Sequence, residues 1–118
     1  MKFEKMFSPI QIGPMEVKNR FVVPPMGNNF ANTDGTMSDQ SVAYYGARAK
    51  GGFGLITLEA TVVHKGAKGG PRKPCLYDDS MTYPIFLSGL ALAKAASNPS
   101  KVAFSKNSLS FIFSYSRE

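Results

Sequence analysis

The sequence predicts an α/β fold built around a strand–helix–strand unit. Two apolar segments, Arg20–Val23 and Gly54–Val63, have the composition of buried strands, and a helical pattern lies between them. The second strand is almost continuously apolar and β-branched, which is typical of a parallel strand covered on both faces. Open doubly wound sheets and (β/α)8 barrels both fit this alternation. In either architecture, ligands bind at the carboxyl ends of the strands.

A short hairpin is predicted ahead of the first strand. Met6–Ile12 is apolar but contains Pro9, which cannot donate a hydrogen bond within a central strand, so this is an edge or lead-in segment. Gly13-Pro14 marks a turn, and Met15–Lys18 is the short return segment.

The helix is predicted to begin after Ser38 and to run to about Lys50. Serine is a common N-cap residue, and Asp39 in the first turn suits the positive end of the helix dipole. Small and apolar residues recur on one face at helical spacing, and we expect this face to pack on the sheet: Val42, Tyr45, Gly46 and Ala49. The glycines of Gly51–Gly54 follow a helix and precede a strand. A dinucleotide-binding loop needs the reverse order, so these glycines predict a turn.

The pattern becomes irregular after Ser80. Residues 78–80 are suited to starting a helix, and Ile85–Ala96 is a stronger helical run. Lys101–Ser105 is a candidate third strand. Ser108–Ser116 alternates serine with large apolar side chains, which is a strand-like pattern.

Charge and cysteine content limit the function classes. The chain has 118 residues, a net charge of +6 and one cysteine, Cys75, which excludes an internal disulfide framework and a Cys-rich metal site. Basic residues gather in His64–Pro74, and both a phosphate or nucleic-acid site and a solvated loop fit that pattern. The loop has no aromatic side chains for base stacking, so we do not expect nucleic acid as a partner. No apolar run suits a signal peptide or a membrane helix, so we expect a soluble, cytoplasmic protein.

Three motifs in order resemble the start of the Old Yellow Enzyme family. They are FSPIQIGPMEVKNRFVVPPMG, YYGARAKGGFGLITLEATVV and LYDDS, and the resemblance covers about Phe7–Ser80. The family contains flavin-dependent ene-reductases related to the bacterial 2,4-dienoyl-CoA reductases and NADH:flavin oxidoreductases. The resemblance implies that residues 1–80 are the N-terminal portion of an FMN-binding TIM barrel and that residues 81–118 are a divergent tail. It implies a reaction in which NAD(P)H reduces FMN and the flavin passes hydride to an activated alkene, an enoate or enone.

The resemblance also implies which residues contact the flavin. Carried over by position, Pro24, Pro25, Met26 and Gly27 line the ring at the end of the first strand, and Ala60 contacts it at the end of the second. Taken alone, the two prolines are also typical of a plain strand terminator. Gly27 is a departure, because many relatives have Thr or Cys there, whose side chain tunes the flavin.

Other candidate residues have structural interpretations. Glu59, on an apolar strand, is expected to be paired or to lie at the exposed strand end, and Tyr44 and Tyr45 to be packing residues. His64 is the only histidine, and its place in the basic loop gives it no visible catalytic partner.

The family pattern fails after Ser80. The Gln that binds the flavin at the third strand, the His/Asn or His/His pair that orients the substrate and the Tyr proton donor have no counterpart in this sequence. We therefore expect about three βα units of the barrel and no independent turnover. The alternative is a non-catalytic fragment that assembles with another chain supplying the rest of the barrel, because open strand edges invite pairing.

Overall fold

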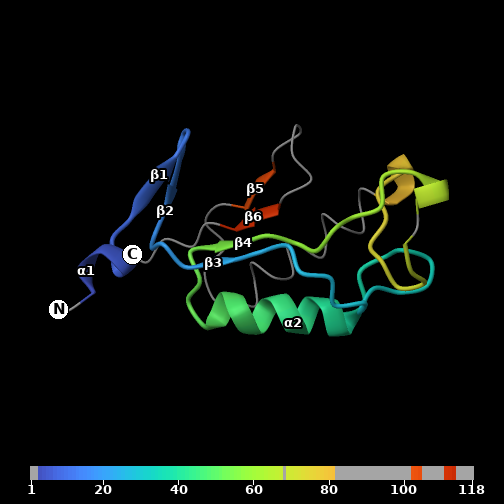
Figure 1. The fold of residues 1–118 in the computed structure, drawn as a ribbon, viewed down its shortest axis with the longest axis horizontal. Coiled ribbons are helices and arrows are strands. Elements are labelled where there is room, and N and C mark those ends of the chain that lie inside the picture. Colours follow the sequence, from blue (N-terminus) through green and yellow to red (C-terminus); the bar gives the residue numbers. More distant parts are fainter. Residues whose placement is uncertain (1–2, 68, 82–101, 105–110, 114–118) are drawn as a thin grey trace.

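The computed structural model describes residues 3–67, 69–81, 102–104 and 111–113, and it begins with the predicted hairpin (Figure 1). Strand β1, Ile10–Ile12, pairs antiparallel with β2, Met15–Val17, and Gly13 makes the turn at a φ of 57°. The lead-in differs from the prediction, because a helical turn, α1 at Glu4–Phe7, precedes the hairpin. The amide N–H of Met6 donates to the Phe3 carbonyl within this turn.

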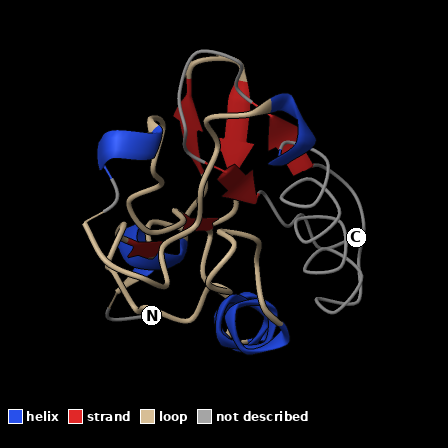
Figure 2. Cartoon of the chain, turned by 90° about the vertical axis from the view of Figure 1, so that its right-hand side faces the viewer, coloured by secondary structure: helices blue, strands red, loops and turns tan. Residues whose placement is uncertain are grey.

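The strand–helix–strand unit is confirmed. Strand β3, Val22–Val23, pairs in parallel with β4, Leu55–Ile56, and the helix α2, Asp39–Lys50, connects them. Figure 1 shows α2 running beneath both strands, and Figure 2, which looks nearly along its axis, places it on one side of them.

Both strands are shorter than the sequence predicts. Pairing on β3 stops where Pro24 and Pro25 begin, because proline has no backbone N–H to donate. The last link is from the Thr57 amide to the Val23 carbonyl. Further along, Val62 forms only an isolated bridge with Cys75, so most of the predicted second strand is extended backbone without a strand partner among the described residues.

Helix α2 packs its predicted face on the strands. The Ser38 hydroxyl accepts a hydrogen bond from the Ser41 amide and caps the helix. The buried cluster between helix and strands consists of one helix side chain and three strand-side residues: Tyr45, Val23, Ile56 and Leu58. At the other end, the amide of Gly51 donates to Ala47, and Gly52 turns the chain toward β4 at a φ of 93°. The prediction of a helix-to-strand turn is therefore confirmed.

The described part of the C-terminal region contains two strands. Strand β5, Val102–Phe104, and β6, Phe111–Phe113, lie where the sequence predicts strands. They pair antiparallel with each other, whereas a third barrel unit would give parallel pairing with β4. Only residues 105–110 connect them, and a connection this short suits a hairpin, since parallel strands need a long crossover. The predicted helix Ile85–Ala96 lies outside the described residues.

A helical turn begins where the sequence predicts it, at residues 79–81. The Ser80 amide donates to the Asp78 carboxylate at 2.9 Å, and this hydrogen bond lowers the pKa of the Asp78 carboxyl. Within the residues that the structure describes, no helix has both the length and the apolar character needed to cross a membrane.

Candidate functional site

The five predicted contact residues lie at the carboxyl ends of two neighbouring parallel strands. Residues 24–27 directly follow β3, and Ala60 follows the segment that extends β4. Because β3 and β4 are parallel and paired, their carboxyl ends share one edge of the sheet. All five residues are exposed there, and Met26 retains 63% of its accessible surface. The structure thus leaves this strand-end surface open to a ligand.

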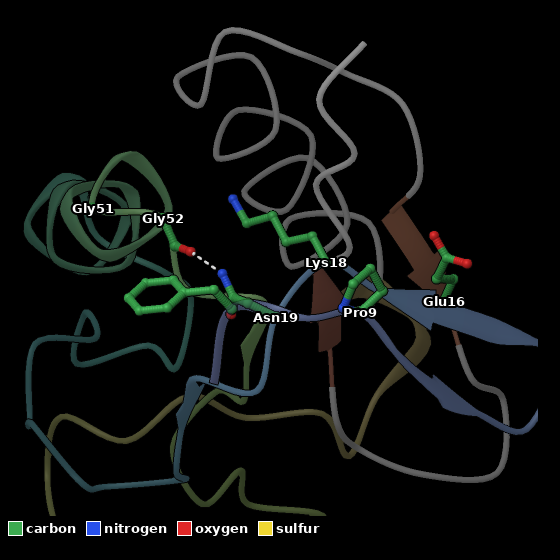
Figure 3. Close-up of a pocket in the computed structure, with 7 residues that line it drawn as sticks. Pro9, Glu16, Lys18, Asn19, Gly51 and Gly52 are labelled. Carbon is green, nitrogen blue, oxygen red and sulfur yellow. Dashed lines mark hydrogen bonds between the residues drawn. The ribbon is translucent and has the colours of Figure 1, made fainter. Parts of the chain in front are cut away.

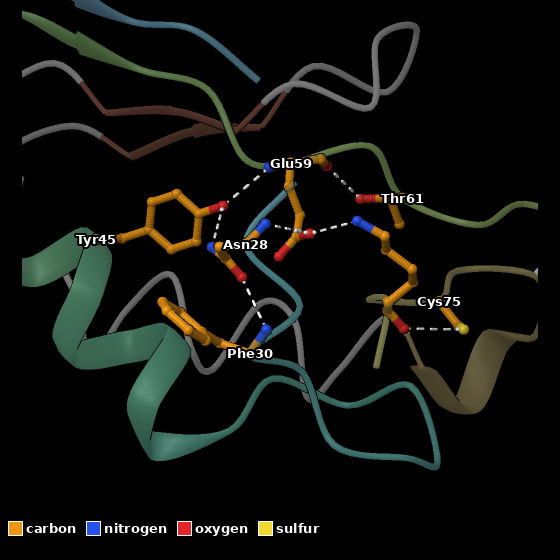
Figure 4. A network of polar contacts seen from close by, with 7 residues as sticks. Asn28, Phe30, Tyr45, Glu59, Thr61 and Cys75 are labelled. Carbon is orange, nitrogen blue, oxygen red and sulfur yellow. Dashed lines mark hydrogen bonds and ion pairs between the residues drawn. The ribbon is translucent and has the colours of Figure 1, made fainter. Parts of the chain in front are cut away.

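A buried carboxylate holds the two strand ends together (Figure 4). Glu59 is only 2% exposed, and its Oε2 accepts a hydrogen bond from the Asn28 amide at 3.1 Å. The same oxygen forms an ion pair with the Lys73 ammonium and accepts a hydrogen bond from it at 3.2 Å. Asn28 directly follows Gly27, and Glu59 directly precedes Ala60. Glu59 therefore connects the residues next to both halves of the strand-end surface, and the prediction that it is paired is confirmed.

Tyr45 supports the same connection from helix α2. Its hydroxyl oxygen accepts hydrogen bonds from the Glu59 amide at 2.9 Å and from the Asn28 side-chain amide at 3.3 Å. Burial raises the pKa of the Tyr45 hydroxyl, and the nearby Glu59 carboxylate adds to this effect. The sequence predicts only a packing role for Tyr45. Its place on the sheet-facing side of a helix could have indicated a polar role, because a buried tyrosine hydroxyl needs a hydrogen-bond partner.

Lys73 belongs to this site, although the sequence places it in a loop of unspecified role. Its Nζ lies so close to Gly27 that a Cβ added there would stand 2.5 Å from it. The other described basic residues of the loop make contacts away from this point. Arg72 donates from Nε to the Ala31 carbonyl at 2.9 Å, and the Lys65 ammonium lies 5.7 Å from the centre of the Tyr77 ring. Three residues of the basic loop thus serve packing and pairing.

His64 is not brought into the site. Its side chain is exposed in the basic loop, and its Nδ1 accepts the Gly66 amide at 3.1 Å. Tyr44 packs edge-on against Phe30 and Tyr45, so its predicted packing role is confirmed.

A pocket of about 510 Å³ lies at the opposite end of the strands (Figure 3). It lies between the hairpin and the turn after α2, beside Asn19, whose side-chain amide donates to the Gly52 carbonyl at 2.8 Å. Asn19 precedes β3 and Gly52 precedes β4, so the pocket is at the amino ends of the strands. Residues at that end of a parallel sheet usually serve stability, and chemistry occurs at the carboxyl ends.

A family model matches residues 5–83, which is more than half of the chain, and its description is the NADH:flavin oxidoreductase / NADH oxidase family. The chain belongs to this family. Members of the family use FMN with NAD(P)H, so the resemblance seen in the sequence is confirmed at the level of the family.

Known proteins of this family align with only part of this chain and are much longer than it. A NADH oxidase of Thermoanaerobacter brockii is 51% identical over 57 residues, which are 48% of this chain and 9% of that protein. A cinnamate reductase of Clostridium sporogenes is 38% identical over 77 residues, 63% of this chain and 12% of that protein. The chain thus spans about a tenth of the length of these relatives.

Solved structures of the family establish the fold class. A complex of 2-naphthoyl-CoA reductase with 2-naphthoyl-CoA matches with a TM-score of 0.73 at 30% identity, over 79% of this chain and 14% of that one. The Old Yellow Enzyme of Pichia sp. AKU4542 matches with a TM-score of 0.65 at 26% identity, over 80% of this chain and 24% of that one. These proteins are TIM barrels, so the chain is part of a (β/α)8 barrel, and the doubly wound alternative is excluded.

The strand-end surface has the chemical character that the flat ring of FMN requires. Pro24, Pro25 and Met26 present exposed apolar atoms, which suit the face of a ring. Among the described residues, neither the Gly27 amide nor the Ala60 amide has a hydrogen-bond acceptor, so both are available to the polar edge of a ring. The residues present therefore fit this cofactor.

Proposed function

We propose that the strand-end surface, residues 24–27 with Ala60, forms part of the FMN site of an NAD(P)H-dependent oxidoreductase that reduces activated alkenes. The observation that carries the proposal is the pairing of exposed apolar atoms with two available backbone amides at one edge of the sheet. The similarity to a cinnamate reductase supports an α,β-unsaturated substrate class.

Bound FMN supplies the hydride chemistry, and the protein contributes position and environment. Pro24 and Pro25 would fix the backbone beside the ring, because their own φ angles are restricted and the Met26 amide donates to the Pro24 carbonyl at 2.9 Å across a tight turn at Pro25. Met26 would cover apolar ring surface and exclude water, and the amides of Gly27 and Ala60 would donate to the polar edge. Glu59, buried behind them, keeps the two donors at a fixed separation.

An FMN titration followed by nuclear magnetic resonance tests the proposal. We expect the amide signals of Gly27 and Ala60 to shift on adding FMN to the ¹⁵N-labelled chain, while that of Gly13 in the distant hairpin turn stays unchanged. Met26→Asp should weaken binding, whereas Met6→Asp is a matched control, since Met6 is also exposed but lies in α1. Unshifted Gly27 and Ala60 signals at millimolar FMN would contradict the proposal.

We propose further that the chain by itself does not turn over. The only histidine, His64, is exposed and its Nδ1 accepts the Gly66 amide, so no histidine pair is available to orient a substrate carbonyl. The purified chain with FMN, NADH or NADPH and an enone is expected to show no alkene reduction above free FMN. Stoichiometric FMN absorbance together with catalysed NAD(P)H-dependent enone reduction would refute this expectation.

A second candidate function is a non-catalytic component that assembles with a chain supplying the remaining barrel strands. The observation that favours it is Val22, which is 47% exposed on the sheet face opposite α2, while its neighbour Val23 is buried against the helix. Co-expression with the remaining strands of a family barrel should raise FMN affinity, and Val22→Lys should abolish the gain. No gain with the unsubstituted chain would eliminate this candidate.

A further inference from the structure

The ion pair between Lys73 and Glu59 has a defined direction. The Lys73 side chain is 20% exposed and that of Glu59 is 1% exposed, so the positive group lies toward the surface and the negative group lies behind it. Glu59 Oε2 also accepts the Asn28 amide, which fixes the carboxylate on the inner side (Figure 4). A ligand on the strand-end surface therefore meets the positive end of the pair first.

Gly27 allows the ammonium to reach that surface. The Lys73 Nζ occupies the space where a side chain at position 27 would begin, at 2.5 Å from the added Cβ. Gly27 has no positive φ, so the backbone conformation itself does not demand glycine there. Glycine at this position therefore leaves room for the Lys73 ammonium beside Glu59 Oε2.

We propose that Lys73 tunes the cofactor, because its ammonium stabilises the electron-rich reduced ring at the strand-end surface more than the oxidised ring. The inference rests on the proposed function, since it needs FMN at this surface. The charged neighbours are limited: Glu59 partly offsets the ammonium, Arg72 donates to the Ala31 carbonyl, and Lys65 lies over Tyr77. A charge at contact distance, even at an effective dielectric constant of about 20, is enough to change relative affinities about tenfold.

The test compares the affinity of the chain for oxidised FMN with that for dithionite-reduced FMN under anaerobic conditions. Lys73→Met should weaken binding of reduced FMN about tenfold more than binding of oxidised FMN. Glu59→Gln should change the ratio of the two dissociation constants in the opposite direction, because it removes the offsetting charge and keeps the ammonium. Lys65→Met is the matched control, a lysine of the same loop that lies away from Gly27, and should leave the ratio unchanged.

Opposite changes of this ratio in Lys73→Met and Glu59→Gln distinguish tuning from a purely structural role. A purely structural role would weaken the binding of oxidised and reduced FMN equally. Removing Lys73 leaves Glu59 buried without its cation, so Lys73→Met risks unfolding. In that case the ratio of dissociation constants is compared between Lys73→Arg, which keeps the charge, and the double variant Lys73→Met/Glu59→Gln. If the ratio of the two dissociation constants is the same in the unsubstituted chain, in Glu59→Gln and in the double variant, the inference is overturned and the proposed function is not. No binding of either form by the unsubstituted chain would overturn the proposed function and the inference with it.

Discussion

Glu59 joins two segments that lie far apart in the sequence. A carboxylate at 2% exposure is costly unless it is paired and hydrogen-bonded, and here Lys73 and the Asn28 amide share one of its oxygens. Its Oε1 is buried and has no hydrogen-bond partner among the described residues. Within the part of the chain that the structure describes, no further hydrogen bond is therefore available to replace a lost one, so the loss of any one contact should measurably lower the free energy of unfolding.

Tyr45→Phe should lower the free energy of unfolding by about 2 kcal/mol, because it leaves the buried Glu59 amide and the half-buried Asn28 side chain without their acceptor. Urea denaturation of both chains measures the difference. The ring remains, so core packing is kept, and Tyr44→Phe is the control with its hydroxyl outside the network. Equal effects of the two substitutions would contradict the role assigned to the Tyr45 hydroxyl.

The Tyr45 contribution should also depend on pH. Burial raises the folded-state pKa of this hydroxyl above its ordinary value of 10.0, so the unfolded chain loses the proton at lower pH than the folded chain. The stability that neutral Tyr45 contributes is fully present below pH 10 and is lost as the pH rises from there through the folded-state pKa. The stability difference between the unsubstituted chain and Tyr45→Phe should therefore shrink across this range in urea titrations. A constant difference would show that the hydroxyl does not titrate in this way.

Gly27→Ala should cost up to about 1 kcal/mol of stability, because the new methyl group pushes the Lys73 ammonium, the end of a flexible and partly exposed side chain, away from Glu59. The same substitution in a Lys73→Met background should cost much less, since the obstructing group is gone. A double-mutant cycle by urea denaturation measures this coupling. Additive effects would show that the two residues act independently. Gly13→Ala is not a suitable control, because Gly13 has a positive φ and would be strained for a different reason.

Helix α2 is the element that carries Tyr45 to the site, and its start is fixed by Ser38. Ser38→Ala should destabilise the chain by about 1 kcal/mol, because the Ser41 amide loses its cap and the Phe30 carbonyl loses the Ser38 hydroxyl. Ser38→Asp keeps an N-cap acceptor and should retain most of the capping contribution. Thermal unfolding followed by circular dichroism distinguishes them, and equal melting temperatures for both variants would contradict the capping role.

The elements were largely predictable from the sequence, and the site only in part. Periodicity and capping signals predict α2 and the hairpin because both depend on nearby residues. The C-terminal end of β3 is predictable because Pro24 and Pro25 cannot donate backbone hydrogen bonds. The contacts of Lys73 and Tyr45 with Glu59 could not be predicted, because they join residues 14 positions apart through tertiary folding. The tail is similar: alternation predicts β6, but its antiparallel pairing with β5 follows from the short connection.

For the molecule as a whole, the sheet face opposite α2 decides how the chain behaves in solution. Val22 exposes 47% of its surface on that face, and Figure 1 shows that α2 lies on the other side of β3 and β4. Strand β6 lies beside β4, so Val22 on β3 is the exposed apolar side chain of this face, and such a side chain on a short sheet favours association with another sheet. We expect sedimentation velocity to show mass above 12.8 kDa that rises with concentration.

Val22→Lys should reduce this association, because a charge at this exposed position of β3 opposes sheet-to-sheet contact. Val63→Lys is the matched control, since Val63 is 54% exposed and adds the same charge, but lies beyond the strands beside the basic loop. The two variants should keep equal helical signals in circular dichroism and differ in sedimentation. Equal association of Val22→Lys and Val63→Lys, or a monomer at every concentration of the unsubstituted chain, would show that this face does not drive assembly.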